Sequence, residues 1–229
     1  MTYSILFIDE QKSAHREFKR EFLDNNKDNF TGSYILPEAS LDQMIEVIYK
    51  INPDAILTDF SLNEYKTDLK YEVQYDGGDL ANEIHARRQG FPVFITTSLG
   101  DDAAKEGADV KIIYEKYGSF KDGKNDRNET RSDTQHLTFS NKLYYEIKAY
   151  KQFLDDSSSE FDSLLEKRSS SPSGLKLEEE ERLIQLDGIL EGLMDNQSKI
   201  PEDLKTTSNA QKLEELLSLA KKIVSETQL

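Results

Sequence analysis

Ile5-Leu6-Phe7-Ile8-Asp9-Glu10 and Asp54-Ala55-Ile56-Leu57-Thr58-Asp59 are the two stretches that decide the fold of this chain. Each is a short, almost wholly apolar run that ends directly in acidic residues. Runs of this length and composition are typical of strands buried on both faces of a parallel sheet. The sequence predicts five such strands, at Tyr3 to Ile8, Ser33 to Leu36, Asp54 to Thr58, Pro92 to Thr96 and Val110 to Tyr114.

Amphipathic stretches alternate with these runs, and their spacing predicts helices between the strands. The predicted helices are Lys12 to Asp24, Leu41 to Ile51, Asp79 to Gln89 and a short one at Asp101 to Glu106. Alternating strands and helices predict an α/β fold, doubly wound around a five-stranded parallel sheet, over residues 1–155. Two polar stretches, 61–78 and 118–136, exceed a minimal α/β unit, and we interpret them as insertions.

The last third of the chain has a different pattern. Leu143, Ile147 and Leu154 recur at helical spacing and predict a helix that covers the sheet. Residues 156–174 are rich in serine and are predicted to be a linker. Residues 175–229 contain two leucine-rich amphipathic stretches, which predict an α-helical hairpin that needs a further apolar surface to cover it.

Composition limits the kinds of partner. The 229 residues carry a net charge of −15, which disfavours nucleic acid as a partner because its phosphates would be repelled. Residues 175–229 alone hold 12 acidic and seven basic side chains, a net charge of −5. Cysteine is absent, which excludes disulfides, thiolate metal sites and cysteine nucleophiles. No apolar run is long enough to span a membrane and the first residues lack a signal-peptide pattern, so we expect a cytoplasmic protein without membrane contact.

Polar residues follow four of the five predicted strands where each strand ends. They are Asp9 and Glu10, Asp59, Thr97 with Ser98, and Lys116. Because the carboxyl ends of parallel strands meet at one edge of a sheet, we expect these side chains to lie together. Carboxylates beside a hydroxyl and an ammonium group could hold a divalent cation next to a nucleophilic aspartate.

These segments, in this order, resemble the receiver domain of two-component response regulators. The resemblance rests on Ile5 to Gln11, Pro53 to Phe60, Pro92 to Ser98 and Ile113 to Lys116, and it covers residues 1 to about 155. It implies a flavodoxin-like fold with strand order 2-1-3-4-5. It also implies a phosphorylation switch that is not itself an enzyme, beyond accepting and losing its own phosphoryl group.

The resemblance also implies a role for each matching residue. Asp59 would accept the phosphoryl group, and Asp9, Glu10, Asp59 and the backbone carbonyl near Ser61 would hold Mg²⁺. Lys116 and Thr97 would contact the phosphoryl oxygens. The implied partners are a histidine kinase or phosphotransfer protein. We further expect a protein client bound through the C-terminal helices, and a homodimer is compatible with their apolar stripes.

Three positions depart from the family pattern, and two alternatives remain open. Glu10 stands where a second aspartate is usual, Tyr117 replaces the proline after Lys116, and Ile113 stands at the position of the switch aromatic. The first alternative is a pseudo-receiver, which has the fold but acts as a binding or scaffold module without phosphorylation. The second, less favoured, is a metal-dependent phosphohydrolase, because Gln11 stands where such enzymes have a second aspartate.

Overall fold

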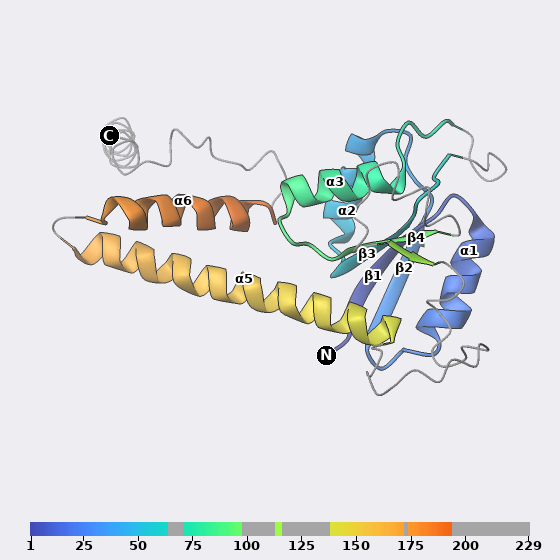
Figure 1. Ribbon diagram of the computed structural model, residues 1–229, viewed down its shortest axis with the longest axis horizontal. Coiled ribbons are helices and arrows are strands. Elements are labelled where there is room, and N and C mark those ends of the chain that lie inside the picture. Colours follow the sequence, from blue (N-terminus) through green and yellow to red (C-terminus); the bar gives the residue numbers. More distant parts are fainter. Residues whose placement is uncertain (64–70, 98–112, 116–137, 172–173, 194–229) are drawn as a thin grey trace, which may run out of the picture. The chain divides into compact units, whose positions relative to one another are not determined.

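A computed structural model of the chain describes residues 1–63, 71–97, 113–115, 138–171 and 174–193 (Figure 1). It confirms the predicted α/β class, with a parallel sheet and helices that alternate with its strands. The chain divides into two compact units, Met1–Gln152 and Phe153–Leu229. The first contains the sheet, and all the described site residues lie in it.

The sheet has the strand order β2-β1-β3-β4-β5 and all of its neighbouring pairs are parallel. The strands are β1 (Tyr3–Ile8), β2 (Phe30–Ile35), β3 (Ala55–Asp59), β4 (Val93–Thr97) and β5 (Ile113–Glu115). From β1 the chain adds β2 on one side, and it then crosses to the other side of β1 to add β3, β4 and β5. The strand order therefore reverses between β1 and β3. In open α/β sheets this is the position where ligands bind, outside the carboxyl ends of the strands.

The described helices are α1 (Lys12–Glu17), the π-helix η1 (Phe18–Leu23), α2 (Leu41–Ile51), α3 (Gly77–Arg87), α5 (Phe139–Ser170) and α6 (Leu177–Glu191). Local signals fix their ends. Ser40 caps α2, because its hydroxyl accepts a hydrogen bond from the backbone N–H of Gln43. Asn52 ends α2 with a left-handed backbone, at φ 50°.

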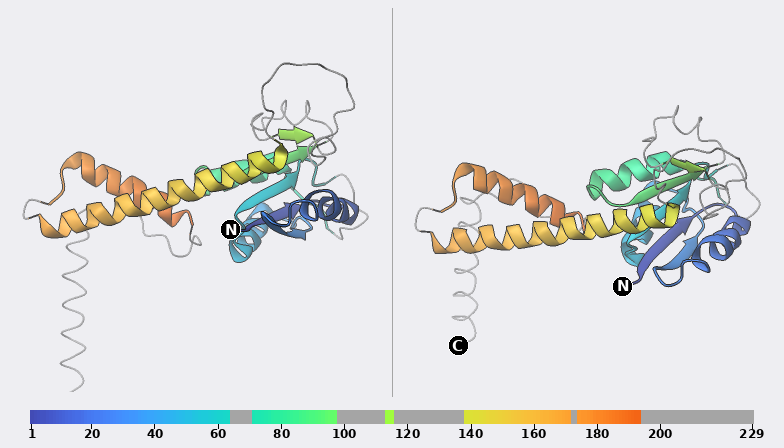
Figure 2. Two further views of the ribbon diagram at one scale, coloured as in Figure 1. Left: turned by 90° about the horizontal axis from the view of Figure 1, so that it is seen from below. Right: turned by 60° about the horizontal axis from the view of Figure 1, so that its bottom comes forward.

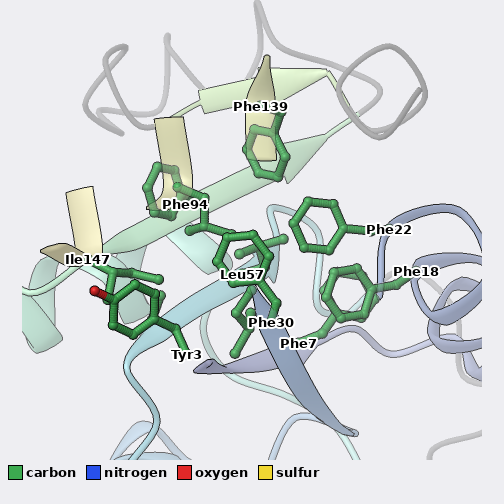
Figure 3. Packing of buried hydrophobic residues seen from close by; sticks show 12 residues of the cluster. Tyr3, Phe7, Phe18, Phe22, Phe30, Leu57, Phe94, Phe139 and Ile147 are labelled. Carbon is green, nitrogen blue, oxygen red and sulfur yellow. The ribbon is translucent and has the colours of Figure 1, made fainter. Parts of the chain in front are cut away.

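An aromatic cluster forms the core on one face of the sheet (Figure 3). Phe18 and Phe22 of η1 stack on each other with ring centroids 5.4 Å apart, and Phe18 stacks on Phe7 of β1 at 4.6 Å. The first turns of α5 close the cluster, since the ring of Phe139 meets Phe22 edge-on at 5.7 Å. Because side chains alternate along a strand, Leu6 and Ile56 are buried on the opposite face of the sheet.

Two predicted boundaries move for local reasons. The second strand begins at Phe30, three residues before its predicted start. It lies at the edge of the sheet and is mostly exposed, so it lacks the apolar pattern of a covered strand. The helix predicted from Asp79 begins at Gly77, because Asp76 caps it and forms a capping box with Asp79.

The predicted linker at 156–174 is wrong for residues 156–170, which continue helix α5 (Figure 2). Serine disfavours a helix only weakly compared with glycine or proline. Here the hydroxyls of Ser159, Ser169 and Ser170 each donate to the carbonyl four residues earlier, at 2.7–2.9 Å. Serine composition alone therefore gave a misleading signal.

The described part of the second unit is a pair of helices. Helix α6 lies beside the second half of α5 in all views (Figures 1 and 2), and ion pairs join Arg182 to Glu160 and Lys167 to Glu179. Leu183 and Leu186 are buried. The predicted second helix of the C-terminal hairpin falls within 194–229 and lies outside the described residues. Within the described ranges, no helix combines the length and the apolar character needed to cross a bilayer.

Candidate functional site

Asp9 and Glu10 follow β1 directly, and both are fully buried. The Oδ1 atom of Asp9 accepts a hydrogen bond from the backbone N–H of Gln11 at 2.8 Å. This contact holds the carboxylate against the start of α1, whose N-cap is Gln11. The acidic pair is therefore part of the turn between β1 and α1, and the local backbone holds the Asp9 carboxylate in place.

Asp59 is the last residue of β3 and is only 7% exposed. Its Oδ1 atom accepts a hydrogen bond from the backbone N–H of Phe60 at 3.0 Å, and its backbone carbonyl accepts one from the Thr58 hydroxyl, also at 3.0 Å. Ser61 follows in the described part of the loop and is half-buried. The Asp59 carboxylate is thus held close to its own main chain at the edge of the sheet.

The register of the strands brings the two aspartates to the same edge. Ile8 of β1 pairs with Thr58 of β3, so Asp9 and Asp59 are the next residues along two adjacent strands. Neighbouring strands lie about 4.8 Å apart. Asp9 and Asp59 each lie two residues after a core residue, Phe7 and Leu57, so both aspartates belong to the same face of the sheet. The predicted convergence of Asp9 and Asp59 therefore agrees with the register.

Helix α3 approaches Asp59 more closely than any side chain would allow. A Cβ atom placed on Gly77 would lie 2.1 Å from the backbone oxygen of Asp59 and 3.1 Å from the Cα of Phe60. The backbone N–H of Gly77 also donates to the carbonyl of Phe60 at 2.8 Å. Only glycine permits this approach, so Gly77 sets the position of the α3 N-terminus relative to Asp59.

His15 is a site residue that the sequence did not single out. Because His15, His85 and His136 lack the spacing of metal ligands, the sequence predicts surface or helix positions for them. His15 does lie on α1, but it is 5% exposed and its Nε2 is 2.9 Å from the backbone oxygen of Asp9. Its ring packs beside Tyr34 at 5.3 Å. The signal was its spacing, because His15 precedes Phe18 and Phe22 by three and seven residues and so shares their buried helix face.

Two other predicted site residues, Thr97 and Lys116, lie at or beyond the ends of the described segments. Thr97 ends β4, and only its backbone is described; the neighbouring Thr96 pairs with Asp59 and donates its hydroxyl to the carbonyl of Thr58 at 3.3 Å. The Thr96 hydroxyl therefore already donates its hydrogen bond within the sheet. Lys116 lies outside the described residues, directly after β5.

Buried carboxylates beside each other suit a cation, because each loses water and repels its neighbour. Oxygen ligands are those that Mg²⁺ prefers, and it is commonly held by one or two carboxylates together with water. In the described ranges, however, no three acidic or histidine side chains are grouped as a ready metal site. Asp9 and Asp59 could supply the one or two carboxylates that Mg²⁺ commonly needs. The full ligand set of Asp9, Glu10, Asp59 and Ser61 stays a prediction.

The fold and the strand-end residues together define an α/β protein with an acidic edge at its topological switch point. A scan of protein-family models finds no match, and neither does a search of curated proteins. Among solved structures, the chain is similar to NtrX from Brucella abortus, with 14% sequence identity and a TM-score of 0.40. The match covers 81% of this chain, which spans about a third (34%) of the NtrX chain. Strand order, register and the residues at the carboxyl edge are therefore the features of this chain that bear on its function.

Proposed function

We propose that this protein is a receiver-type phosphorylation switch in which Asp59 accepts a phosphoryl group. The observation that supports this most directly is the register that places Asp9 and Asp59 side by side at the carboxyl edge, in a sheet of order β2-β1-β3-β4-β5. In such a sheet, reactive groups gather at this position. The donor would be a phosphohistidine on a histidine kinase or phosphotransfer protein.

In the proposed transfer, a carboxylate oxygen of Asp59 attacks phosphorus, a P–O bond forms and the P–N bond to the donor imidazole breaks. The electron pair of that bond and a proton go to the imidazole. Asp9 and Glu10 would hold Mg²⁺ beside Asp59, and the cation would offset the negative charge of the phosphoryl group. Lys116 would neutralise a phosphoryl oxygen as a point charge, and Thr97 would donate a hydrogen bond to another.

The proposed output is a change in protein contacts. Asp59 lies at the edge of the sheet against α3, so a new charge there would act first on the surrounding loops and on that helix. The client would bind through the C-terminal helices, whose acidic surface disfavours nucleic acid. In this proposal the protein works in the cytoplasm, catalyses no reaction on other molecules, and has either a monomeric or a homodimeric form.

A second candidate is the pseudo-receiver, which has the fold and binds partners without phosphorylation. The burial of Asp59 favours it, because a carboxylate that is 7% exposed offers little room to an incoming phosphodonor. A receiver would need the Asp59 loop to open, whereas a scaffold would not. The two candidates therefore differ in whether Asp59 can be reached.

The test is incubation of the full chain with Mg²⁺ and acetyl phosphate, followed by intact-mass measurement. A switch gains one phosphoryl group on the wild type and none on Asp59→Asn. Asp42→Asn is the matched control, because the Asp42 side chain is 88% exposed and belongs to α2, not to the strand ends that carry the acidic edge. This control keeps the mass gain. No gain in any variant, with the fold intact by circular dichroism, refutes the switch and supports the pseudo-receiver. Steady release of phosphate from unrelated monoesters would instead indicate a phosphohydrolase.

A further inference from the structure

Arg88 is a buried cation without a counter-charge in the described part of the chain. It is the C-cap residue of α3 and is only 7% exposed. Its Nε and Nη1 atoms are enclosed and have no hydrogen-bond partner among the described residues. Arginine is rarely buried unless it is paired, because a charged group loses its hydration when it leaves water.

Two aromatic rings lie beside this guanidinium. Its Cζ atom lies 4.0 Å from the ring centroid of Phe91 and 6.0 Å from that of Tyr49 on α2. Tyr150 of α5 packs edge-on against Phe91, with ring centroids 5.5 Å apart, and both of these residues are buried. Phe91 and Tyr49 thus form an aromatic wall beside the positive charge, and Tyr150 supports Phe91 from α5.

The rings satisfy only part of what the guanidinium needs. A ring stacked on a guanidinium attracts the positive charge through its face. The N–H donors of arginine point outward in the guanidinium plane, so they still require an acceptor. The C-terminus of α3 gives a further favourable field but supplies no acceptor to Nε or Nη1.

The neighbouring arginine shows the contrast. Arg87 is paired, with its Nε 2.6 Å from Glu83 and its Nη2 3.4 Å from Asp42. Of these two arginines, only Arg88 lacks a counter-charge among the described residues. A monoanion would balance it, whereas a phosphate dianion would leave an excess negative charge among aromatic rings.

We propose that Arg88, with the rings of Phe91 and Tyr49, forms a binding site for a single carboxylate group. A carboxylate is planar and accepts hydrogen bonds in the plane of a guanidinium, where Nε and Nη1 of Arg88 lack acceptors. Because Nε and Nη1 are enclosed, binding requires the aromatic wall to shift. The source of the carboxylate is either a small organic acid or an acidic side chain of a partner protein. This site is independent of the proposed phosphorylation of Asp59.

The test follows the Arg88 Nε–H signal in the NMR spectrum of the full chain during titration at constant ionic strength. The probes are sodium acetate, an acetylated tetraglutamate peptide, sodium phosphate and sodium chloride. We expect a saturable shift with acetate or with the peptide, at an affinity about tenfold above that for chloride and above that for phosphate. Saturation by acetate indicates a small acid as the source, and saturation by the peptide alone indicates a partner's acidic segment.

Variants separate the site from a purely structural arginine. Arg88→Met keeps a long side chain among the rings, and it should abolish the rise in unfolding temperature that the effective probe gives the wild type. Arg87→Met, the matched control, should retain that rise. The proposal is refuted if neither carboxylate probe exceeds chloride, if phosphate binds more tightly than both, or if Arg88→Met responds like the wild type.

Discussion

Substitution of Gly77 by alanine tests how tightly α3 is held against the acidic edge. The added Cβ would lie 2.1 Å from the Asp59 backbone oxygen and 3.0 Å from its carbonyl carbon. Both atoms belong to the main chain of β3, so no change of side-chain rotamer can relieve the clash. Either the strand end or the N-terminus of α3 must therefore move.

The structure offers two glycines for comparison. At Gly32, an added Cβ would meet the Cδ1 atom of Leu23 at 2.6 Å, but this is the end of a flexible side chain. At Gly188, in α6, an added Cβ would meet nothing within 4 Å. The three positions thus differ in what a methyl group would contact: main chain, movable side chain or open space.

The magnitudes follow from these contacts. Overpacking against the main chain at Gly77 should cost about 3 kcal/mol, the upper part of the usual range. The better helix propensity of alanine returns at most about 1 kcal/mol, so the expected net loss is about 2 kcal/mol. Gly32→Ala should leave the free energy of unfolding nearly unchanged. A new rotamer of Leu23 should cost about 1 kcal/mol, and alanine should return a similar amount because it has less conformational freedom than glycine in the unfolded chain. Gly188→Ala should stabilise by about 0.5–1 kcal/mol.

Urea unfolding followed by far-ultraviolet circular dichroism measures these differences. With a slope near 2 kcal/mol/M, Gly77→Ala should lower the midpoint of its unit by about 1 M. It should also reduce the yield of phosphorylated Asp59, because it displaces the backbone that carries the carboxylate. An unchanged or higher midpoint for Gly77→Ala, or the order of the three variants reversed, would show that the close approach is not a constraint in solution.

Three further outcomes can be measured. Asp54→Ala should lose about 2 kcal/mol in urea unfolding, because its carboxylate accepts from the β1 backbone and pairs with Lys151 at 2.6 Å. A double-mutant cycle should assign less than about 1 kcal/mol to the pair with Lys151, which is partly exposed, and a larger coupling would contradict this. Burial, followed by nearby negative charge, raises the pKa of Tyr75 above its ordinary value. Stability should therefore be complete below pH 10 and fall above it, by at most about 1.4 kcal/mol per pH unit, and Tyr75→Phe should flatten this fall in unfolding measured from pH 9 to 11. His15→Phe keeps a ring but loses the contact with the Asp9 carbonyl, so we expect a loss of about 1 kcal/mol and slower phosphorylation of the chain by acetyl phosphate. An equal rate would restrict His15 to packing.

The class of fold was predictable because its signals are local and repeated. Short apolar runs, each followed by an amphipathic stretch, allow few arrangements other than a parallel sheet with crossover helices. The strand ends then fix the acidic edge, since parallel strands end on the same side. Asp9 and Asp59 could be placed together from this argument alone, and the register Ile8 to Thr58 agrees with it.

Features that depend on tertiary contacts could not be predicted in the same way. The Ser-rich segment of α5 reads as a linker, but its hydroxyls bond within the helix and α6 lies along it. The exposure of β2 follows from its place at the edge of the sheet, which composition does not reveal. The environment of Arg88 combines a nearby ring, Phe91, with the ring of Tyr49 on α2, and only the second is distant in sequence.

The contact at Gly77 also bears on how a signal would leave Asp59. A side-chain contact can absorb a small displacement by a change of rotamer, but a contact between two main chains cannot. Helix α3 meets the Asp59–Phe60 backbone in this second way and is also hydrogen-bonded to it. A movement of the β3 end by even a few tenths of an ångström must therefore be passed to α3. The proposed switch thus has a stiff connection to α3 that does not depend on the aromatic residue which Ile113 replaces.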